Sequence, residues 1–109
     1  MQTLVALGSF EAKARSLLGD KGFDELLEFL ARRPKAGRII QGTGGLRKVR
    51  IASSGRGKRG GARVIYYYHN EHKPLLLFLI YAKAKQENMT DAQKAEYRKL
   101  LSQIIDEFG

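Results

Sequence analysis

Apolar residues recur along the chain with two different spacings, and these spacings predict where helices and strands lie. The short apolar run 3–7 predicts a first strand. After Ser9, a good helix N-cap, apolar residues return every three or four positions up to Gly19, and again over 22–33 before Pro34. We therefore expect two helices that form a hairpin.

The second half of the chain predicts three strands and a last helix. Aliphatic and basic residues alternate over 46–52, whereas 62–69 and 75–81 are apolar at successive positions, which is typical of strands buried on both faces. The short connections between these strands indicate an antiparallel meander. Thr90 and Gln93 have the spacing of a capping box, which predicts that a helix begins there.

This order of elements predicts the α+β class. We expect an N-terminal helical hairpin and a C-terminal helix packed on a small, mainly antiparallel four-stranded sheet. A chain of 109 residues has room for one domain, covering 1–109. We expect the helices to cover one face of the sheet, while Lys48 and Arg50 project from a partly open opposite face.

Composition excludes several classes of protein. The chain has no cysteine, which excludes disulfide scaffolds, zinc–thiolate sites and cysteine nucleophiles. The longest apolar run, Leu75 to Ala82, is too short to span a membrane, and the first residues lack the features of a signal peptide. His69 and His72 flank a turn with too few neighbouring ligands for a metal. We expect a cytoplasmic protein without cofactor, metal or membrane contact.

Charge is concentrated in one quarter of the sequence. The net charge is +9, and eight of the 20 basic residues lie between Arg38 and Arg63, where there is no acidic residue. Such a cluster attracts a polyanion, most commonly nucleic acid. The alternative is a solvated basic loop without a ligand. We favour a ligand because the cations continue from the loop into both flanking strands.

The segment 55–60 has the letters of a dinucleotide-binding fingerprint, G-x-G-x-x-G, but the wrong surroundings. That fingerprint requires a helix after it, whereas a strand is predicted here. We interpret it as a basic hairpin loop in which Arg56, Lys58 and Arg59 bind an RNA backbone.

Strand order predicts that cations from separate strands meet. In a meander, the end of 75–81 lies beside the start of 62–69, which lies beside the end of 46–52. Arg50, Arg63 and Lys83 should therefore converge, with Lys48 one step away on the face of Arg50. These four cations predict a phosphate-binding site.

Other residues near this site are candidate RNA contacts. Arg47 and Lys85 add positive charge. Tyr67 and Tyr81 could stack on bases, although filling the core is the simpler interpretation of both. A DNA-binding repressor is a weaker hypothesis, because no predicted helix has a basic recognition face.

The run GTGGLRKVRIASSGRGKRGGARVIYYY at 42–68, followed by LLLFLIYAKAKQENMT at 75–90, resembles the RelE/HigB superfamily of type II toxin–antitoxin toxins, most closely its HigB-like branch. The resemblance covers nearly the whole chain. It implies a RelE-like fold and a ribosome-dependent mRNA endonuclease. It also implies that the partners are a cognate antitoxin protein, the ribosome and mRNA, with DNA contacted only through the antitoxin.

The resemblance also implies catalytic roles for Lys48, Arg50, Arg63 and Lys83. Two features depart from the family pattern. Ala84-Lys85 stands where many HigB-like members have Asn-Glu, and the stretch 86–89 lacks the tyrosine that RelE-like members often have there. Either tyrosine chemistry is absent, or Tyr81 or Tyr67 serves instead.

These residues suit metal-independent cleavage by the RNA 2′-hydroxyl. The planar fork of Arg63 would hold the scissile phosphate, with Lys83 as a second clamp. Arg50 would neutralise the neighbouring phosphate. Lys48 would act as general base, because surrounding positive charge favours its neutral form. The alternative function is a non-catalytic RNA- or ribosome-binding module that uses the same cations.

Overall fold

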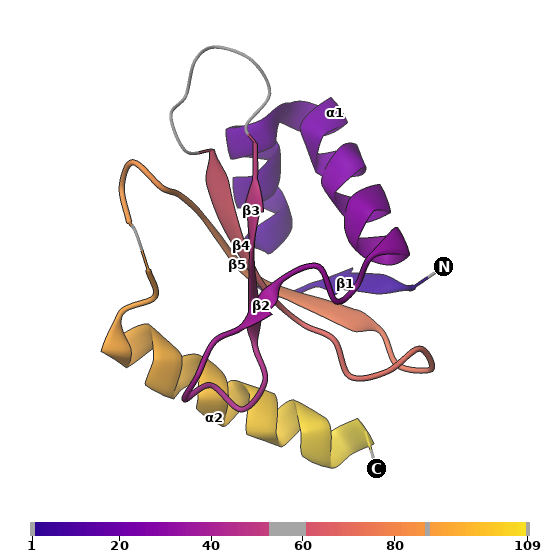
Figure 1. Cartoon of the computed structure of the whole chain (residues 1–109), viewed down its shortest axis with the longest axis vertical. Coiled ribbons are helices and arrows are strands. Elements are labelled where there is room, and N and C mark those ends of the chain that lie inside the picture. The colour runs from indigo at the N-terminus through magenta and orange to yellow at the C-terminus, as the bar shows by residue number, and fades with distance from the viewer. Residues whose placement is uncertain (1, 53–60, 87, 109) are drawn as a thin grey trace.

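A computed structural model describes residues 2–52, 61–86 and 88–108 of the chain. The elements within them are β1 (Leu4–Ala6), α1 (Phe10–Arg32), β2 (Arg38–Ile39), β3 (Arg47–Ile51), β4 (Ala62–Tyr67), β5 (Leu75–Ala82) and α2 (Asp91–Phe108). The strands form one sheet in the order β1-β5-β4-β3-β2 (Figure 1). β1 runs parallel to β5, and the other neighbouring strands are antiparallel.

The predicted meander is confirmed as β3–β4–β5, but the prediction of four strands is wrong. A fifth strand, β2, pairs with β3 in a segment for which we had predicted no strand. The chain can reverse between them because Gly42, Gly44 and Gly45 adopt positive φ angles of 81°, 82° and 124°. The buried Thr43 hydroxyl donates to the Ile40 carbonyl and accepts from the Leu46 N–H, which closes the turn.

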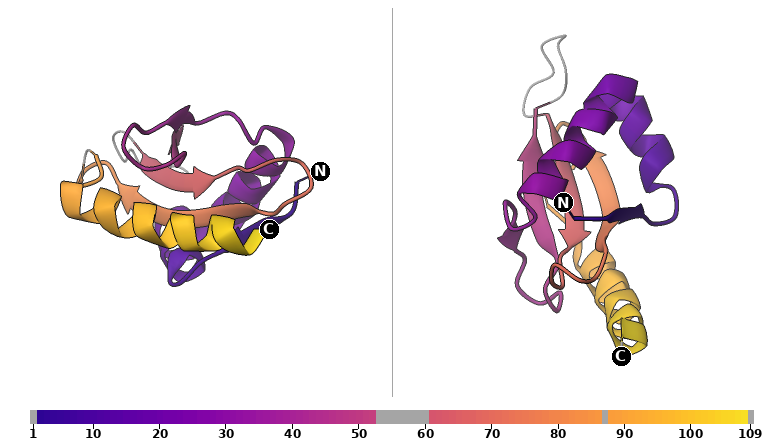
Figure 2. Two further views of the ribbon diagram at one scale, coloured as in Figure 1. Left: turned by 90° about the horizontal axis from the view of Figure 1, so that it is seen from below. Right: turned by 90° about the vertical axis from the view of Figure 1, so that its right-hand side faces the viewer.

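The helical hairpin is present, with a shorter break than expected. A single residue, Gly19, interrupts α1 with φ 77° and ψ 168°. The two arms on either side of Gly19 lie next to one another (Figures 1 and 2). This φ lies in the left-handed region that favours glycine, so Gly19 is the residue that allows the chain to turn back.

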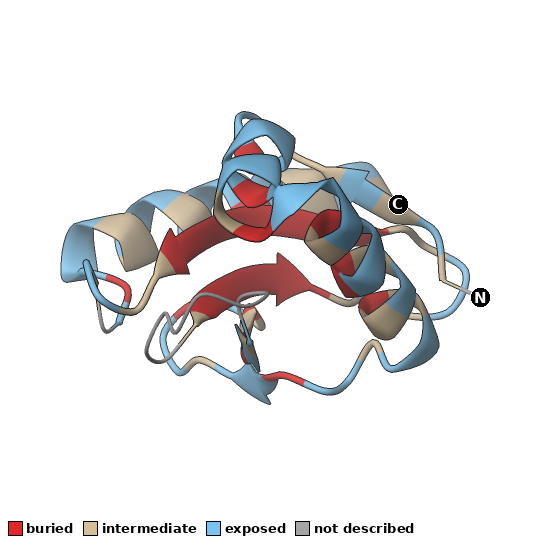
Figure 3. Cartoon of the chain, turned by 90° about the horizontal axis from the view of Figure 1, so that it is seen from above, coloured by how far each residue is buried: buried red, intermediate tan, exposed pale blue. Residues whose placement is uncertain are grey.

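The helices cover both faces of the sheet, so the expectation of one open face is wrong. On one face, the buried α1 residues pack against Val64, Tyr66 and Leu77. On the other, Leu101 and half-buried apolar residues of α2 pack against Ile65 and Leu76. Two faces are covered because β4 and β5 are apolar at nearly every position and need cover on both sides (Figure 3). We refer to these as the α1 face and the α2 face.

Polar contacts hold both ends of α2. The predicted capping box is confirmed: the Gln93 N–H donates to the Thr90 hydroxyl at 3.1 Å, and the Thr90 N–H donates to the Gln93 side-chain carbonyl at 3.0 Å. At the other end, Lys73 Nζ donates to the Phe108 carbonyl, and the His69 ring meets the Phe108 ring edge-on. Neither described helix is long and apolar enough to cross a membrane.

Three tyrosines make stability sensitive to alkaline pH. Burial raises the pKa of Tyr66, Tyr67 and Tyr97 above the ordinary value of 10.0, with the charge of Glu96 adding to the effect at Tyr97. Unfolding would release each phenol to ionise at its ordinary pKa. Their contribution to stability is therefore fully present below about pH 10 and is lost as the pH rises beyond it.

We expect the free energy of unfolding, measured by urea denaturation, to fall from pH 9 to pH 11. Tyr97→Phe keeps the apolar ring and removes one ionisation, so it should flatten this decline. Equal declines in the variant and the wild type would exclude Tyr97 as a contributor.

Candidate nucleic-acid interface

The sheet register brings the central predicted cations together. Arg50 lies opposite Arg63, and Arg63 lies opposite Tyr81, so these residues form one row across β3, β4 and β5. Directly opposed residues project to the same face, which here is the α2 face. The Lys83 N–H donates to the Gly61 carbonyl at 3.1 Å, which places Lys83 beside the start of β4. Arg50, Arg63 and Lys83 thus gather at one end of the sheet.

Lys48 lies one step along β3 from Arg50, on the same face. Its Nζ donates to Asn88 Oδ1 at 2.7 Å. Asn88 belongs to the connection between β5 and α2, so this connection reaches across the sheet as far as β3. Lys48 is also paired with Arg38 of β2. Sequence reasoning counted Arg38 in the basic cluster but did not place it beside Lys48, and it missed Asn88, because each reaches Lys48 only through tertiary pairing.

The cations just placed, namely Arg38, Lys48, Arg50, Arg63 and Lys83, differ in exposure. Arg38 and Arg50 are exposed, and Lys48 and Lys83 are half-buried. Arg63 is only 9% exposed. Arg63 therefore forms the floor of the interface and is less accessible than its expected role in holding the scissile phosphate suggests.

Among the described residues, no carboxylate pairs with the exposed cations of this interface. The ion pairs among the described residues lie within α1, apart from one between Glu71 and His72 in the connection from β4 to β5. Within 2–52, 61–86 and 88–108, no ion pair or side-chain hydrogen bond engages Arg38, Arg50 or Lys83. Their charge is thus available to an anionic ligand.

Arg47 does not join the interface. Because side chains alternate along β3, Arg47 projects to the α1 face, opposite Tyr66. Its Nη1 donates to the Gly37 carbonyl at 2.8 Å. Our prediction that Arg47 binds RNA is therefore not supported by its position, and its contact is a structural one.

The two candidate stacking residues are buried. Tyr67 is 8% exposed, packs in the α2-face core, and shares a 2.8 Å hydrogen bond with His69 Nδ1. Tyr81 is 7% exposed in the same core. The core interpretation holds for both rings, and only Tyr81 adjoins the cations, through its row with Arg63.

The remaining predicted RNA contacts lie outside this row. Lys85 is exposed in the turn after β5, where its N–H donates to the Ala82 carbonyl. Arg56, Lys58 and Arg59 lie outside the described residues.

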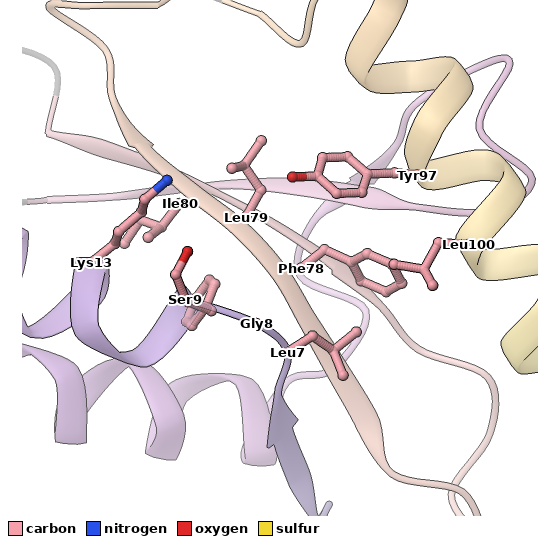
Figure 4. Close-up of a pocket in the computed structure, with 10 residues that line it drawn as sticks. Leu7, Gly8, Ser9, Lys13, Phe78, Leu79, Ile80, Tyr97 and Leu100 are labelled. Carbon is pink, nitrogen blue, oxygen red and sulfur yellow. The ribbon is translucent and has the colours of Figure 1, made fainter.

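A separate apolar hollow lies between the start of α1, β5 and α2 (Figure 4). It has a volume of about 190 Å³, and its lining includes Phe78, Tyr97 and Leu100. None of the candidate site residues lines it. The row of cations across β3, β4 and β5 therefore lies apart from this hollow.

Comparison with known protein families places most of the chain within one of them. A family model described as the RelE toxin of the RelE/RelB toxin–antitoxin system matches residues 14–107. The matched range includes both helices, except for the first turn of α1, and every cation of the interface.

Proposed function

The chain belongs to the RelE toxin family, and we propose on this basis that it cuts mRNA on the ribosome by metal-independent attack of the RNA 2′-hydroxyl. RelE toxins act in toxin–antitoxin systems and are generally ribosome-dependent mRNA endonucleases. The observation that carries the proposal is the row of Arg50 and Arg63, flanked by Lys48 and Lys83. On its sequence motifs we assign the chain to the HigB-like branch.

The chemistry requires little beyond positioned positive charge. The 2′-oxygen forms a bond to the adjacent phosphorus while the bond from phosphorus to the 5′-oxygen breaks. A base takes the 2′ proton, and the 5′-oxygen gains a proton. The products are a 2′,3′-cyclic phosphate and a 5′-hydroxyl. Cations lower the barrier because negative charge grows on the phosphate oxygens in the transition state.

Each residue of the interface has a proposed role that suits its position. Arg63, at the floor, binds the scissile phosphate, and Lys83 beside it is the second clamp. The exposed Arg50 neutralises the neighbouring phosphate. Lys48 is the proposed general base, and its hydrogen bond to Asn88 orients the amine.

The interface offers few side chains that could protonate the leaving 5′-oxygen. The stretch 86–89 has no tyrosine, and of the two candidate tyrosines it is Tyr81 that lies in the row with Arg63, so we propose Tyr81 for this step. With so few acid–base groups, the enzyme depends on the ribosome to hold the message in a reactive geometry. We further propose a cytoplasmic protein that a cognate antitoxin silences, with DNA contacted only through that antitoxin.

Primer extension on a translated message tests the proposal. We expect purified protein to produce discrete stops when ribosomes are present and almost none on the same RNA alone. A message with a single 2′-deoxynucleotide before the scissile phosphate should resist cleavage, because the nucleophile is missing. Cleavage of the deoxy-substituted message at the normal rate would exclude attack by the 2′-hydroxyl.

One observation favours a second function, a non-catalytic RNA- or ribosome-binding module. Arg63, which the nuclease proposal places on the scissile phosphate, is only 9% exposed. Such a module would inhibit translation while leaving every message intact in the same primer-extension assay.

A further inference from the structure

The two-residue strand β2 is held by several polar contacts. The Gly37 N–H donates to the Tyr66 hydroxyl at 2.7 Å, and Arg47 Nη1 donates to the Gly37 carbonyl at 2.8 Å. Just beyond the strand, the Ile40 N–H donates to the Leu46 carbonyl at 2.8 Å. The backbone on both sides of Arg38 is thus anchored to β3 and β4.

These contacts place Arg38 at the edge of the cationic interface. Arg38 is the register partner of Lys48, so both side chains project to the α2 face. The Arg38 side chain is exposed, and no carboxylate within 2–52, 61–86 and 88–108 pairs with it. A rigid backbone that presents an exposed, unneutralised guanidinium beside Lys48 suits the binding of an anion.

Within the described residues, positive charge continues from Lys48 along its own row in one direction. On the β4 side of Lys48, the row continues with Ile65 and Leu79, which are buried in the α2-face core. On the β2 side, it continues with Arg38. A polyanion that occupies Arg50 and Lys48 therefore meets further positive charge along this row only toward β2.

We infer that Arg38 binds a phosphate of the RNA backbone where the strand passes over Lys48 and leaves the sheet at β2. This inference rests on the proposed function, because it takes the cleaved message as the ligand. Arg38 lies two strands away from Arg63, with β3 between them. It holds the strand in place and does not touch the reacting phosphate.

Kinetics with ribosome-bound message test this role. Arg38→Ala should raise the substrate concentration at half-maximal rate roughly tenfold, the lower end for a charged hydrogen bond, and leave kcat within about twofold. It should also reduce the slope of log affinity against log salt by about 0.7, the loss of one phosphate contact. Arg38→Lys keeps the charge and should recover most of the affinity.

Arg33→Ala is the matched control. Arg33 is exposed immediately after α1, the helix that covers the α1 face, and the substitution removes the same charge. If Arg38→Ala and Arg33→Ala behave alike, or if Arg38→Ala lowers kcat and not affinity, the inference is wrong.

Binding to an uncleavable message separates this inference from the proposed function. The probe is ribosome-bound message with a 2′-deoxynucleotide at the cleavage position. The wild-type protein could fail to cleave message while Arg38→Ala, and not Arg33→Ala, lowers affinity for this probe. That result would refute the proposed nuclease function and support RNA binding by Arg38. Cleavage by the wild-type protein, together with unchanged affinity of Arg38→Ala for the probe, would support the nuclease function and refute RNA binding by Arg38.

Discussion

Arg63→Ala should lower the rate of message cleavage by about 10²–10³-fold, the usual cost of removing one preorganised donor to a developing anion. Arg63 lies between Arg50 and Tyr81 in a row across three strands, and the sheet holds its backbone on both sides. Its low exposure keeps water from competing for the guanidinium. The effect should appear in the single-turnover rate with saturating ribosome-bound message.

Two further variants test whether the loss of cleavage rate is specific to the Arg63 guanidinium. Arg63→Lys keeps a positive charge but lacks the planar fork, so it should recover only a small part of the rate. Lys21→Ala removes one exposed charge from α1 and should cleave like the wild type. Far-ultraviolet circular dichroism should show an intact fold in each variant. Cleavage by a folded Arg63→Ala protein within about threefold of the wild-type rate would remove Arg63 from the catalytic residues.

The meander and its row of cations could be predicted from the sequence because both depend on local pattern. Alternation along β3 places Lys48 and Arg50 on one face, and short connections force antiparallel pairing with β4 and β5. Register then follows from which side chains must be buried. The meeting of Arg50 and Arg63 is a direct consequence of this geometry.

The rest depends on contacts between distant segments, which local pattern does not contain. β2 is two residues long and exposed, so it has no strand-like alternation, and the Tyr66 hydroxyl and Arg47 hold it in place from other strands. Contacts between distant segments likewise determine which face of the sheet α2 covers. We expected one open face although β4 and β5 are apolar on both faces, a pattern that already required two covering layers.

The dependence on contacts between distant segments also explains why the predicted roles of single residues differ from their places in the structure. Arg47 has the charge of an RNA contact, but alternation turns it to the α1 face. Tyr67 has the chemistry of a stacking platform, but α2 lies over it. Asn88 has no signal of its own in the sequence, because its role comes from a connection that crosses the sheet to Lys48.

Tyr66→Phe should reduce the free energy of unfolding by about 2–4 kcal/mol, a large effect for the loss of one oxygen atom. The buried Tyr66 hydroxyl accepts from the Gly37 N–H at 2.7 Å and donates to the Pro34 carbonyl at 2.8 Å. Phenylalanine would leave both backbone groups without this partner, and a buried polar group that loses its hydrogen bond costs about 1–3 kcal/mol. Urea denaturation at pH 7 measures the difference.

Tyr68→Phe is the matched control, because Tyr68 is half-buried against the same core and no hydrogen bond engages its hydroxyl in the described part of the chain. It should change the free energy of unfolding by less than about 0.5 kcal/mol. Since the Tyr66 hydroxyl anchors Gly37 and hence Arg38, Tyr66→Phe should also weaken binding of the uncleavable message under conditions where the protein stays folded, whereas Tyr68→Phe should not. Equal stability of the two variants would show that the Pro34 and Gly37 backbone groups find other partners, and that β2 does not depend on this hydroxyl.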